Sequence, residues 1–376
     1  MRRAPRVFFY VQHLLGIGHL ARASRIAGAL AADGFRVTVV TGGSPVAGFP
    51  GAGVAHVALP EIRSDPGFTG LTDASGLPVG DAFMADRRAL LLSAFRESRA
   101  DIVVTEAFPF GRRQVRFELV PLLEAIHGMP GRPRVVASLR DILQERTKPG
   151  RDAESLALAR QFYDLVLVHG DPRFARIEET FPPASAIADR IAYTGLVAAG
   201  LPPPSSDRFD VVVSAGGGAV GGALLAAASG ARRRLGGTTT WALIGGTNLP
   251  AAEYDRVAAD LPTGTELFRF RPDFVGLLRN AQLSVSQAGY NTVCDILGAG
   301  CRSVLVPFAA GGETEQGLRA ARLSALGLAG VVPEAELSAM RLAGAVETAL
   351  SGPPPPPAAL DLNGAAETAR LLRSLL

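Results

Sequence analysis

The chain has 376 residues, more than one hydrophobic core usually serves, so its length predicts two domains. Hydrophobic residues make up 48% and charged residues 19%, which excludes an intrinsically disordered chain because enough apolar surface can be buried to offset chain entropy. Basic residues exceed acidic ones by 38 − 35 = 3, and Lys148 is the single lysine, so the composition gives no sign of nucleic-acid binding.

The cysteines and apolar runs bear on cellular location. Cys294 and Cys301 lack the CxxC spacing of zinc sites and thiol exchange, which favours a reducing compartment. The run Val7–Val11 is too short for a signal peptide, and no run reaches the ~18 apolar residues of a membrane-spanning helix. We expect a cytoplasmic protein, with peripheral contact to the inner membrane face as the open alternative.

Strand-length apolar runs alternate with helix-length amphipathic segments throughout, which predicts an α/β protein with parallel sheets covered by helices. Branched residues on both faces of several runs indicate strands buried on both sides. A helix is predicted over Leu20–Asp33, ended by Gly34. The strands predicted in the first half are Arg6–Val11, Arg36–Thr41, Ile102–Glu106, Arg134–Leu139 and Leu165–His169.

A proline-rich polar segment over residues 199–207 is predicted to be a hinge between an N-terminal domain, 1–198, and a C-terminal domain, 208–352. Pro353–Pro357 is predicted to form a polyproline spacer before a final helix over roughly Ala365–Leu376, which could pack on either domain. The strands predicted in the second domain are Asp210–Ser214, Thr239–Ile244, Glu266–Phe270, Leu283–Ser286 and Ser303–Val306.

The first predicted strand runs through a glycine loop into the first helix, and Gly16, Gly18 and His19 stand in that connection. Ligands of open α/β sheets bind at the carboxyl ends of the strands, where glycines allow close approach. A histidine there can remove a proton from a hydroxyl, so His19 is a candidate general base. It could instead cap or pack the helix start, and His13 is the alternative base.

Other polar residues follow strands of the first domain and could line the side that holds an acceptor. Each could equally serve as a cap or an ion-pair partner. They are Glu106, Arg140, Asp141, His169 and Asp171.

The second domain opens with a glycine cluster, Gly216, Gly217 and Gly218, between a buried strand and a helix, where free amides and the helix dipole suit a diphosphate. With Gly221 these glycines also satisfy the GxGxxG spacing of dinucleotide-binding dehydrogenases. Such an enzyme should have an acidic residue at the end of the next strand, but Gly245 stands there, which disfavours NAD.

A further strand, glycine turn and helix follow in the second domain. The turn at Gly289, with Asn291 and Thr292, offers amides and a hydroxyl to a diphosphate at a helix start. One helical turn after Thr292, Asp295 can accept hydrogen bonds from vicinal ribose hydroxyls. The alternative to a binding site is an ordinary strand–helix–strand unit with a polar loop.

Glu315 and Gln316 come after the next strand and can reach sugar hydroxyls, and Arg271 could meet the charge of a diphosphate. The chain has no Asp-x-Asp motif, so no metal ion and no other cofactor is expected.

These motifs resemble glycosyltransferase family 28, the family of the bacterial peptidoglycan N-acetylglucosaminyltransferases. The similarity is strongest across Leu283–Gly327, with the Val-Pro-Phe strand and the Glu-Gln loop. The resemblance implies a B-fold of two Rossmann-like domains facing each other across a cleft, a UDP-sugar donor, a ribose contact at Asp295 and a donor-sugar contact at Glu315 and Gln316. Asp295 stands where the family usually has glutamate, which shortens the reach.

The first half is similar to a bacterial group of predicted glycosyltransferases with unassigned acceptors. The function predicted is transfer of a hexose or aminosugar from a nucleotide-diphosphate donor to an acceptor hydroxyl, with inversion and without metal. A nucleotide-sugar epimerase or hydrolase and a non-catalytic sugar-nucleotide binding protein are the alternatives, since fold does not fix reaction.

Overall fold

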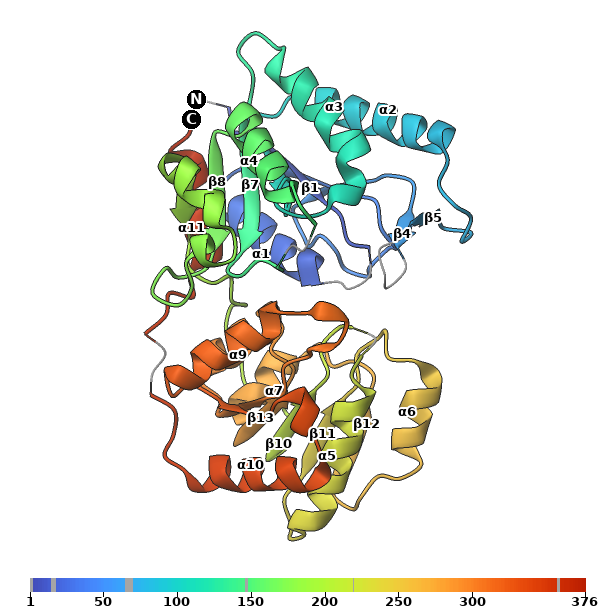
Figure 1. Cartoon of the computed structure of the whole chain (residues 1–376), viewed down its shortest axis with the longest axis vertical. Coiled ribbons are helices and arrows are strands. Elements are labelled where there is room, and N and C mark those ends of the chain that lie inside the picture. The colour runs from blue at the N-terminus through green and yellow to red at the C-terminus, as the bar shows by residue number, and fades with distance from the viewer. Residues whose placement is uncertain (1–2, 15–17, 65–69, 146–147, 219, 357–358) are drawn as a thin grey trace. The chain divides into compact units, whose positions relative to one another are not determined.

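The computed structural model describes residues 3–14, 18–64, 70–145, 148–218, 220–356 and 359–376. The chain divides into two compact units, one of Met1–Val197 with Asp361–Leu376 and one of Ala198–Leu360 (Figure 1). Residues 199–207, the predicted hinge, lie within the second unit.

The first unit is a parallel sheet with the strand order β3-β2-β1-β6-β7-β8-β9, next to a small antiparallel pair, β4 and β5. Its strands are β1 (Arg6–Val11), β2 (Arg36–Thr41), β3 (Ala55–Ala58), β4 (Ile62–Ser64), β5 (Leu71–Asp73), β6 (Ile102–Glu106), β7 (Arg134–Arg140), β8 (Leu165–His169) and β9 (Ile191–Tyr193). Its helices are α1 (Gly18–Ala32), α2 (Asp81–Ser98), α3 (Arg116–His127), α4 (Arg151–Phe162) and α11 (Gly364–Arg373).

The second unit is also a parallel sheet, with the order β12-β11-β10-β13-β14-β15. Its strands are β10 (Val211–Ser214), β11 (Trp241–Ile244), β12 (Thr265–Phe268), β13 (Leu283–Ser286), β14 (Ser303–Leu305) and β15 (Gly330–Val331). Its helices are α5 (Gly222–Leu235), α6 (Ala251–Ala258), α7 (Phe274–Asn280), α8 (Tyr290–Ala299), α9 (Glu315–Ala325) and α10 (Ala339–Ser351). The α/β class predicted from the sequence is confirmed.

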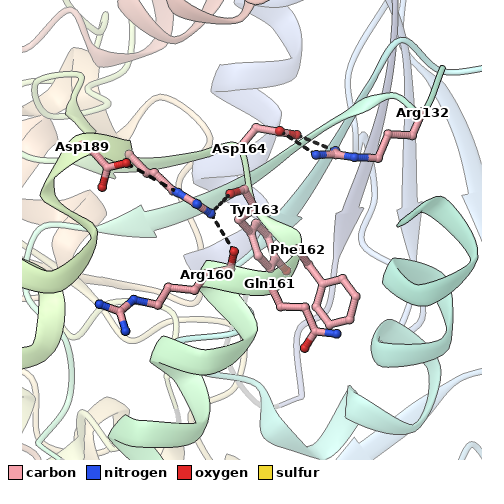
Figure 2. A pocket seen from close by; sticks show the side chains of 8 residues that line it. Arg132, Arg160, Gln161, Phe162, Tyr163, Asp164 and Asp189 are labelled. Atoms are coloured by element: carbon pink, nitrogen blue, oxygen red, sulfur yellow. Dashed lines mark hydrogen bonds and ion pairs between the residues drawn. The ribbon is translucent and has the colours of Figure 1, made fainter. Parts of the chain in front are cut away.

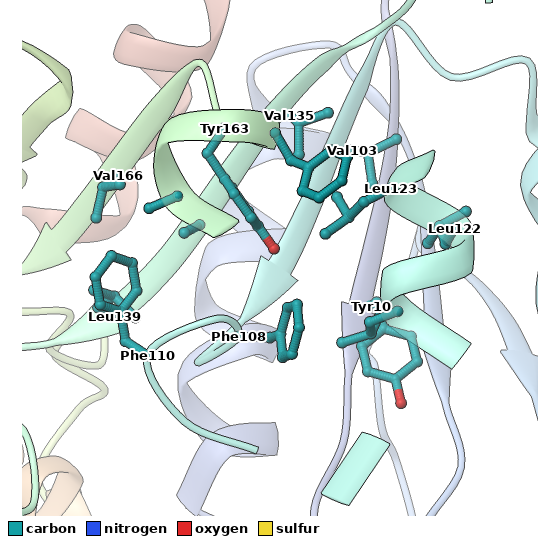
Figure 3. Packing of buried hydrophobic residues seen from close by; sticks show 14 of the residues in the cluster. Tyr10, Val103, Phe108, Phe110, Leu122, Leu123, Val135, Leu139, Tyr163 and Val166 are labelled. Carbon is teal, nitrogen blue, oxygen red and sulfur yellow. The ribbon is translucent and has the colours of Figure 1, made fainter. Parts of the chain in front are cut away.

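The central strands are buried on both faces, as their branched residues predict; β6 and β10 are buried along their whole length. In the first unit, the side chains of the sheet meet those of α2, α3 and α4 in a continuous core. Figure 3 shows part of this core, where Val103 and Val135 of the sheet lie near Leu122 and Leu123 of α3. Because each unit has its own core, the strand ends that carry the candidate site rest on rigid sheets.

The C-terminal helix α11 packs on the first unit, against α1, which resolves the choice of docking domain left open by the sequence (Figure 1). Arg373 donates from Nε to the Asp33 carboxylate at 2.7 Å, and its guanidinium lies 4.5 Å from the centre of the Phe35 ring. The amide of Leu196 donates to the Asp361 carbonyl at 2.7 Å. The tail is therefore an integral part of the first unit.

Gly364 begins α11 where the backbone approaches the Gly195 carbonyl. A Cβ at Gly364 would lie 2.4 Å from that oxygen, so Gly364→Ala should force the tail away and destabilise the first unit by about 1–3 kcal/mol. Gly344→Ala in α10 is the matched control: a Cβ there meets nothing within 4 Å, and the change should stabilise by about 0.4–1 kcal/mol. Calorimetric unfolding of both variants tests this, and equal melting temperatures would contradict it.

Candidate active site

The first sheet reverses its direction of winding between β1 and β6, which lie side by side although β2 and β3 come between them in sequence. Ligands of doubly wound sheets bind in the crevice outside the carboxyl ends of the strands at such a point. Here β1 ends at Val11, Gly18 and His19 begin α1, and β6 ends at Glu106. Gly16, which the sequence places between Val11 and Gly18, lies outside the described residues.

His19 and Glu106 meet at this edge. Nδ1 of His19 lies 3.0 Å from Oε1 of Glu106, and the His19 side chain is 13% exposed while that of Glu106 is fully buried. Arg22, one helical turn after His19, donates from Nη2 to the same carboxylate oxygen, and Ser138 donates to the other oxygen at 2.6 Å. The carboxylate thus has three hydrogen-bonding partners in a dry setting.

The electrostatics fix the charges of this pair. Burial opposes ionisation of Glu106, but the charge of Arg22 and the hydrogen bonds from His19 and Ser138 outweigh it and lower the pKa of the carboxyl. Burial, followed by the positive charge of Arg112, lowers the pKa of His19 to about 3, against the opposing effect of Glu106. Near neutral pH, Glu106 is therefore a carboxylate and His19 a neutral imidazole.

These charges also decide which nitrogen of His19 carries its proton. An ionised carboxylate only accepts hydrogen bonds, so Nδ1–H of His19 donates to Glu106. The other ring nitrogen, Nε2, then holds a lone pair and can accept a proton from a hydroxyl. This is the protonation state that a general base needs.

Among the remaining candidates of the first unit, Asp141 and Asp171 have contacts within the protein. Asp141 is buried and accepts from the Ile142 amide at 2.9 Å, next to Arg140 at the end of β7. Asp171 accepts from Arg173 and from the amide of Asp361, so it holds the tail. His13, the alternative base, is 5% exposed.

The second sheet reverses its winding between β10 and β13. Ser214 pairs with Ser286 in the parallel register, so the loops that follow these strands leave the sheet as neighbours at its carboxyl edge. The Gln287 side chain donates to the Val220 carbonyl at 3.3 Å, which joins the two loops. The segments 216–218 and 289–292, predicted to share a site, are therefore brought together.

The glycine loop after β10 has backbone geometry that few other residues could take. Gly216 has a φ of +73°. A Cβ added at Gly246 would lie only 2.2 Å from the Gly216 carbonyl oxygen, so the two backbones pack closely. Asn248 donates to the Gly217 carbonyl at 2.7 Å, while Gly217 is itself exposed and Gly218 half-buried. The side chain of Asn248 thus holds the loop through a backbone carbonyl, and the loop lies close to the start of α5.

Helix α8 begins at the second loop, with Gly289 as its N-cap. Gly289 has no side chain to accept from the first-turn amides, and a Cβ there would meet nothing within 4 Å, so an anion has room to approach. Asn291 and Thr292 are half-buried in that first turn, and Asp295 follows at 7% exposure. The amides, the hydroxyl and the carboxylate lie within two turns of one helix.

Glu315, Gln316 and Arg271 have partners within the protein. Glu315 is 2% exposed and lies 3.9 Å from Arg319, which donates to the Ala288 carbonyl just before the α8 turn. Gln316 accepts from the Phe308 amide at 3.2 Å. Arg271 is bound by the carboxylates of Asp273 and Asp207, each at 2.8 Å, and these two charges raise its pKa.

A separate cavity of about 370 Å³ opens in the first unit, beside the residues that precede β7, β8 and β9 (Figure 2). Arg132 and Asp164 form a two-pronged ion pair with both distances 2.8 Å, and Arg190 donates to backbone carbonyls. Because these groups satisfy one another, we assign no ligand to this cavity. Within the described ranges, no cluster of three or more His, Cys, Asp or Glu side chains is arranged to hold a metal ion.

In the parts of the chain that the structure describes, none of the helices combines the length and apolar character required to cross a bilayer.

The fold and sequence of the chain match glycosyltransferases. The structure superposes on spinosyn forosaminyltransferase SpnP with a TM-score of 0.64 and 17% identity, covering 99% of this chain and 94% of that one. It superposes on CalG4, the calicheamicin glycosyltransferase, with a TM-score of 0.60 and 19% identity, covering 100% and 94%. The protein thus has the GT-B fold of glycosyltransferases, as predicted.

Residues 239–370 match the glycosyltransferase family 28 C-terminal domain, so the predicted resemblance to this family is confirmed. A UDP-N-acetylglucosamine–N-acetylmuramyl-(pentapeptide) pyrophosphoryl-undecaprenol N-acetylglucosamine transferase of Rhizobium meliloti is 39% identical over 88 residues, 23% of this chain and 24% of the relative. The match therefore spans about a quarter of the length of such relatives.

Two solved structures of the same fold contain a nucleotide. One is a ugt transferase from Siraitia grosvenorii in complex with UDP (TM-score 0.55, 17% identity, 98% of this chain and 93% of that one). The other is the glycosyltransferase VinC in complex with dTDP (TM-score 0.58, 16% identity, 99% and 96%).

Proposed function

We propose that the protein transfers a hexose or aminosugar from a nucleotide-diphosphate donor, a UDP-sugar in the first instance, to an acceptor hydroxyl, with inversion and without a metal ion. The observation that carries the proposal is the hydrogen bond between His19 and Glu106 at the winding reversal of the first sheet. It sets a neutral imidazole, held in one orientation, at the edge where a doubly wound sheet binds its ligand.

In this mechanism His19 is the general base. Its Nε2 takes the proton of the acceptor hydroxyl as the oxygen attacks the anomeric carbon from the side opposite the nucleotide diphosphate. The bond from that carbon to the phosphate oxygen breaks, and the diphosphate leaves with the electron pair. Glu106 stabilises the imidazolium that forms, because its negative charge lies 3.0 Å from Nδ1. Gly16 and Gly18, with Arg140 and Asp141, remain proposed for the acceptor side.

The second unit is the proposed donor site. Amides of Gly216, Gly217 and Gly218 and of the first turn of α8, from Gly289, meet the developing charge on the diphosphate. Two helix starts and a glycine loop offer fixed donors to that charge, so the proposal needs no metal. The match of residues 239–370 to the family 28 C-terminal domain and the UDP and dTDP bound by proteins of similar fold support a nucleotide donor.

The hydroxyls of the donor are assigned to side chains near these amides. Asp295 is proposed to bind the ribose, with Asn291 and Thr292 beside the diphosphate, and Gln316 to bind the sugar. Glu315 is proposed to act through Arg319, which ties α9 to the residue before Gly289.

Arg271 is the weakest of the predicted donor contacts. Two carboxylates already neutralise its charge, and it follows β12, the outer strand of the sheet. We therefore propose that Arg271 holds the segment around Asp207 in place. The diphosphate is then bound by backbone amides and not by Arg271. A cytoplasmic location, with peripheral membrane contact as its variant, remains our proposal for the cell.

A thermal-shift screen of UDP, dTDP, GDP and ADP sugars tests the donor assignment. A UDP-sugar at 100 times its dissociation constant should stabilise the protein by about 2.7 kcal/mol. Asp295→Asn removes a charge-assisted contact worth about 1.5–3 kcal/mol, so it should weaken UDP binding about 10- to 100-fold.

Uracil alone serves as the control ligand, since it lacks both ribose and diphosphate. Stabilisation by NAD, or by none of the four sugars, would contradict the proposed donor. Loss of the sugar from the donor at full rate without any acceptor would identify a hydrolase instead.

A further inference from the structure

A line of buried hydrogen bonds runs from His19 across the first sheet. Glu106 ends β6, and Ser138, its register partner on β7, donates to it at 2.6 Å. Nε2 of His169, the last residue of β8, lies 2.9 Å from the Ser138 hydroxyl, and its Nδ1 lies 2.9 Å from the hydroxyl of Thr194, just beyond β9. The line thus joins four neighbouring strands at their carboxyl ends.

All members behind His19 are withdrawn from water. Ser138 and Thr194 are 1% exposed and His169 is 0% exposed. In such a setting each polar atom must be paired within the protein, because water cannot replace a missing partner. A change of proton position at one member therefore forces its neighbours to change.

The direction of the hydrogen bonds follows from the carboxylate. Glu106 only accepts, so the single hydroxyl proton of Ser138 points to it and the Ser138 oxygen is left as an acceptor. Nε2 of His169 must then carry a proton and donate to Ser138. Nδ1 of His169 is left as an acceptor for Thr194.

Thr194 has a second acceptor within reach, the Gly195 carbonyl at 2.8 Å. If Thr194 donates there, a neutral His169 carries its proton on Nδ1, Ser138 turns its proton toward Nε2, and Glu106 loses a donor. The tautomer of His169 therefore determines how many donors hold the carboxylate that orients His19.

We propose that His169 is a positioning residue: it donates from Nε2 to Ser138, which fixes Glu106 against Nδ1–H of His19 and leaves Nε2 of His19 ready to accept a proton. This inference rests on the proposed role of His19 as base. When Ser138 no longer donates to Glu106, the ion pair with Arg22 still holds the carboxylate. The carboxylate is then free to rotate away from Nδ1 of His19.

The tautomers can be measured without any substrate. The chain has five histidines, so long-range ¹H–¹⁵N spectra of uniformly labelled protein are simple, and His19→Gln and His169→Gln assign the two rings by loss of signal. Between pH 5 and 8 we expect neutral rings, Nδ1–H at His19 and Nε2–H at His169. His169→Phe and Ser138→Ala should both give a mixture of tautomers at His19.

Turnover is the second readout. His169→Phe and Ser138→Ala should each lower kcat about 10- to 100-fold, the scale of a misplaced catalytic group, with donor KM unchanged. The double variant should be no worse than Ser138→Ala alone. His169→Gln keeps an N–H toward Ser138, and Thr194 can then donate to Gly195, so it should recover most of the turnover.

His56→Phe is the matched control, since His56 also bonds a threonine hydroxyl, that of Thr41 at 2.8 Å, but has no link to Glu106. It should leave kcat and the His19 tautomer unchanged. An unaltered His19 tautomer in both His169→Phe and Ser138→Ala would overturn the proposal. If His169→Phe unfolds the protein, Ser138→Ala still tests the proposal, because it removes only one oxygen. If the wild-type protein transferred no sugar to any acceptor, the proposed function would be wrong. The ¹H–¹⁵N spectra would still decide whether His169 controls the His19 tautomer.

Discussion

His19→Ala is expected to lower turnover by about 10²–10⁴-fold, the usual contribution of a general base, while leaving donor affinity unchanged. The change removes the nitrogen that takes the acceptor proton, but it touches no residue of the proposed donor site in the second unit. Steady-state kinetics with a UDP-sugar and an accepted hydroxyl compound measures the first effect. Calorimetric titration with UDP measures the second.

His127→Ala provides the matched histidine control, because His127 ends α3 and takes no part in the proposed site. It should retain wild-type turnover. Near-normal turnover of His19→Ala would remove His19 from the mechanism. If His13→Ala then proved inactive, the base would be His13.

Arg87→Met is expected to destabilise the protein by about 3–5 kcal/mol, because it leaves the carboxylate of Glu118 buried without its cation. Both side chains are 0% exposed, and Arg87 donates to Glu118 from Nε at 2.8 Å and from Nη2 at 3.0 Å. Arg87 also donates to Gln12 at 2.7 Å, so it supports the start of the loop that leads to His19. Urea denaturation of the purified variant measures the loss.

The double variant Arg87→Met with Glu118→Leu leaves neither charge buried, so it should recover part of the stability. Arg370→Met is the surface control: its ion pair with Glu367 is exposed and should contribute nothing measurable. A single Arg87→Met variant as stable as the double variant would show that the buried ion pair does not hold this core.

The central strands could be predicted closely from the sequence. Arg6–Val11, Arg36–Thr41, Ile102–Glu106, Leu165–His169 and Leu283–Ser286 have the predicted bounds, because each is a short apolar run that a buried strand requires. The predictions missed β3, β4, β5, β9 and β15, which are two to four residues long. β3 is mostly exposed, so its side chains carry no hydrophobic pattern.

The sequence also predicted the glycine turns that follow β10 and β13 and lead into helices, because glycine turns and helix starts are local features. It did not predict which side chains pair. Glu106 was assigned to the acceptor side, and its bonds to His19 and Arg22 span 87 and 84 residues. Arg22 stands one helical turn after His19, a local signal that could have suggested a shared partner.

For Arg271 and Glu315, the sequence did not show that each charged side chain already has a partner within the protein. The partners of Arg271 include Asp207, 64 residues earlier, and no local pattern reports such a contact. The hydrogen bond between Ser138 and His169 could not be predicted either, since it exists only once β6, β7 and β8 lie side by side.

The central claim is that amides at the start of α8 and in the glycine loop after β10 bind the diphosphate of a sugar nucleotide. A crystal structure of the protein with UDP tests it most directly. The account predicts phosphate oxygens within hydrogen-bonding distance of amides at residues 216–218 and 290–292, and the ribose hydroxyls at Asp295. UDP bound at another place, with those amides facing water and Asp295 without a ribose contact, would contradict it.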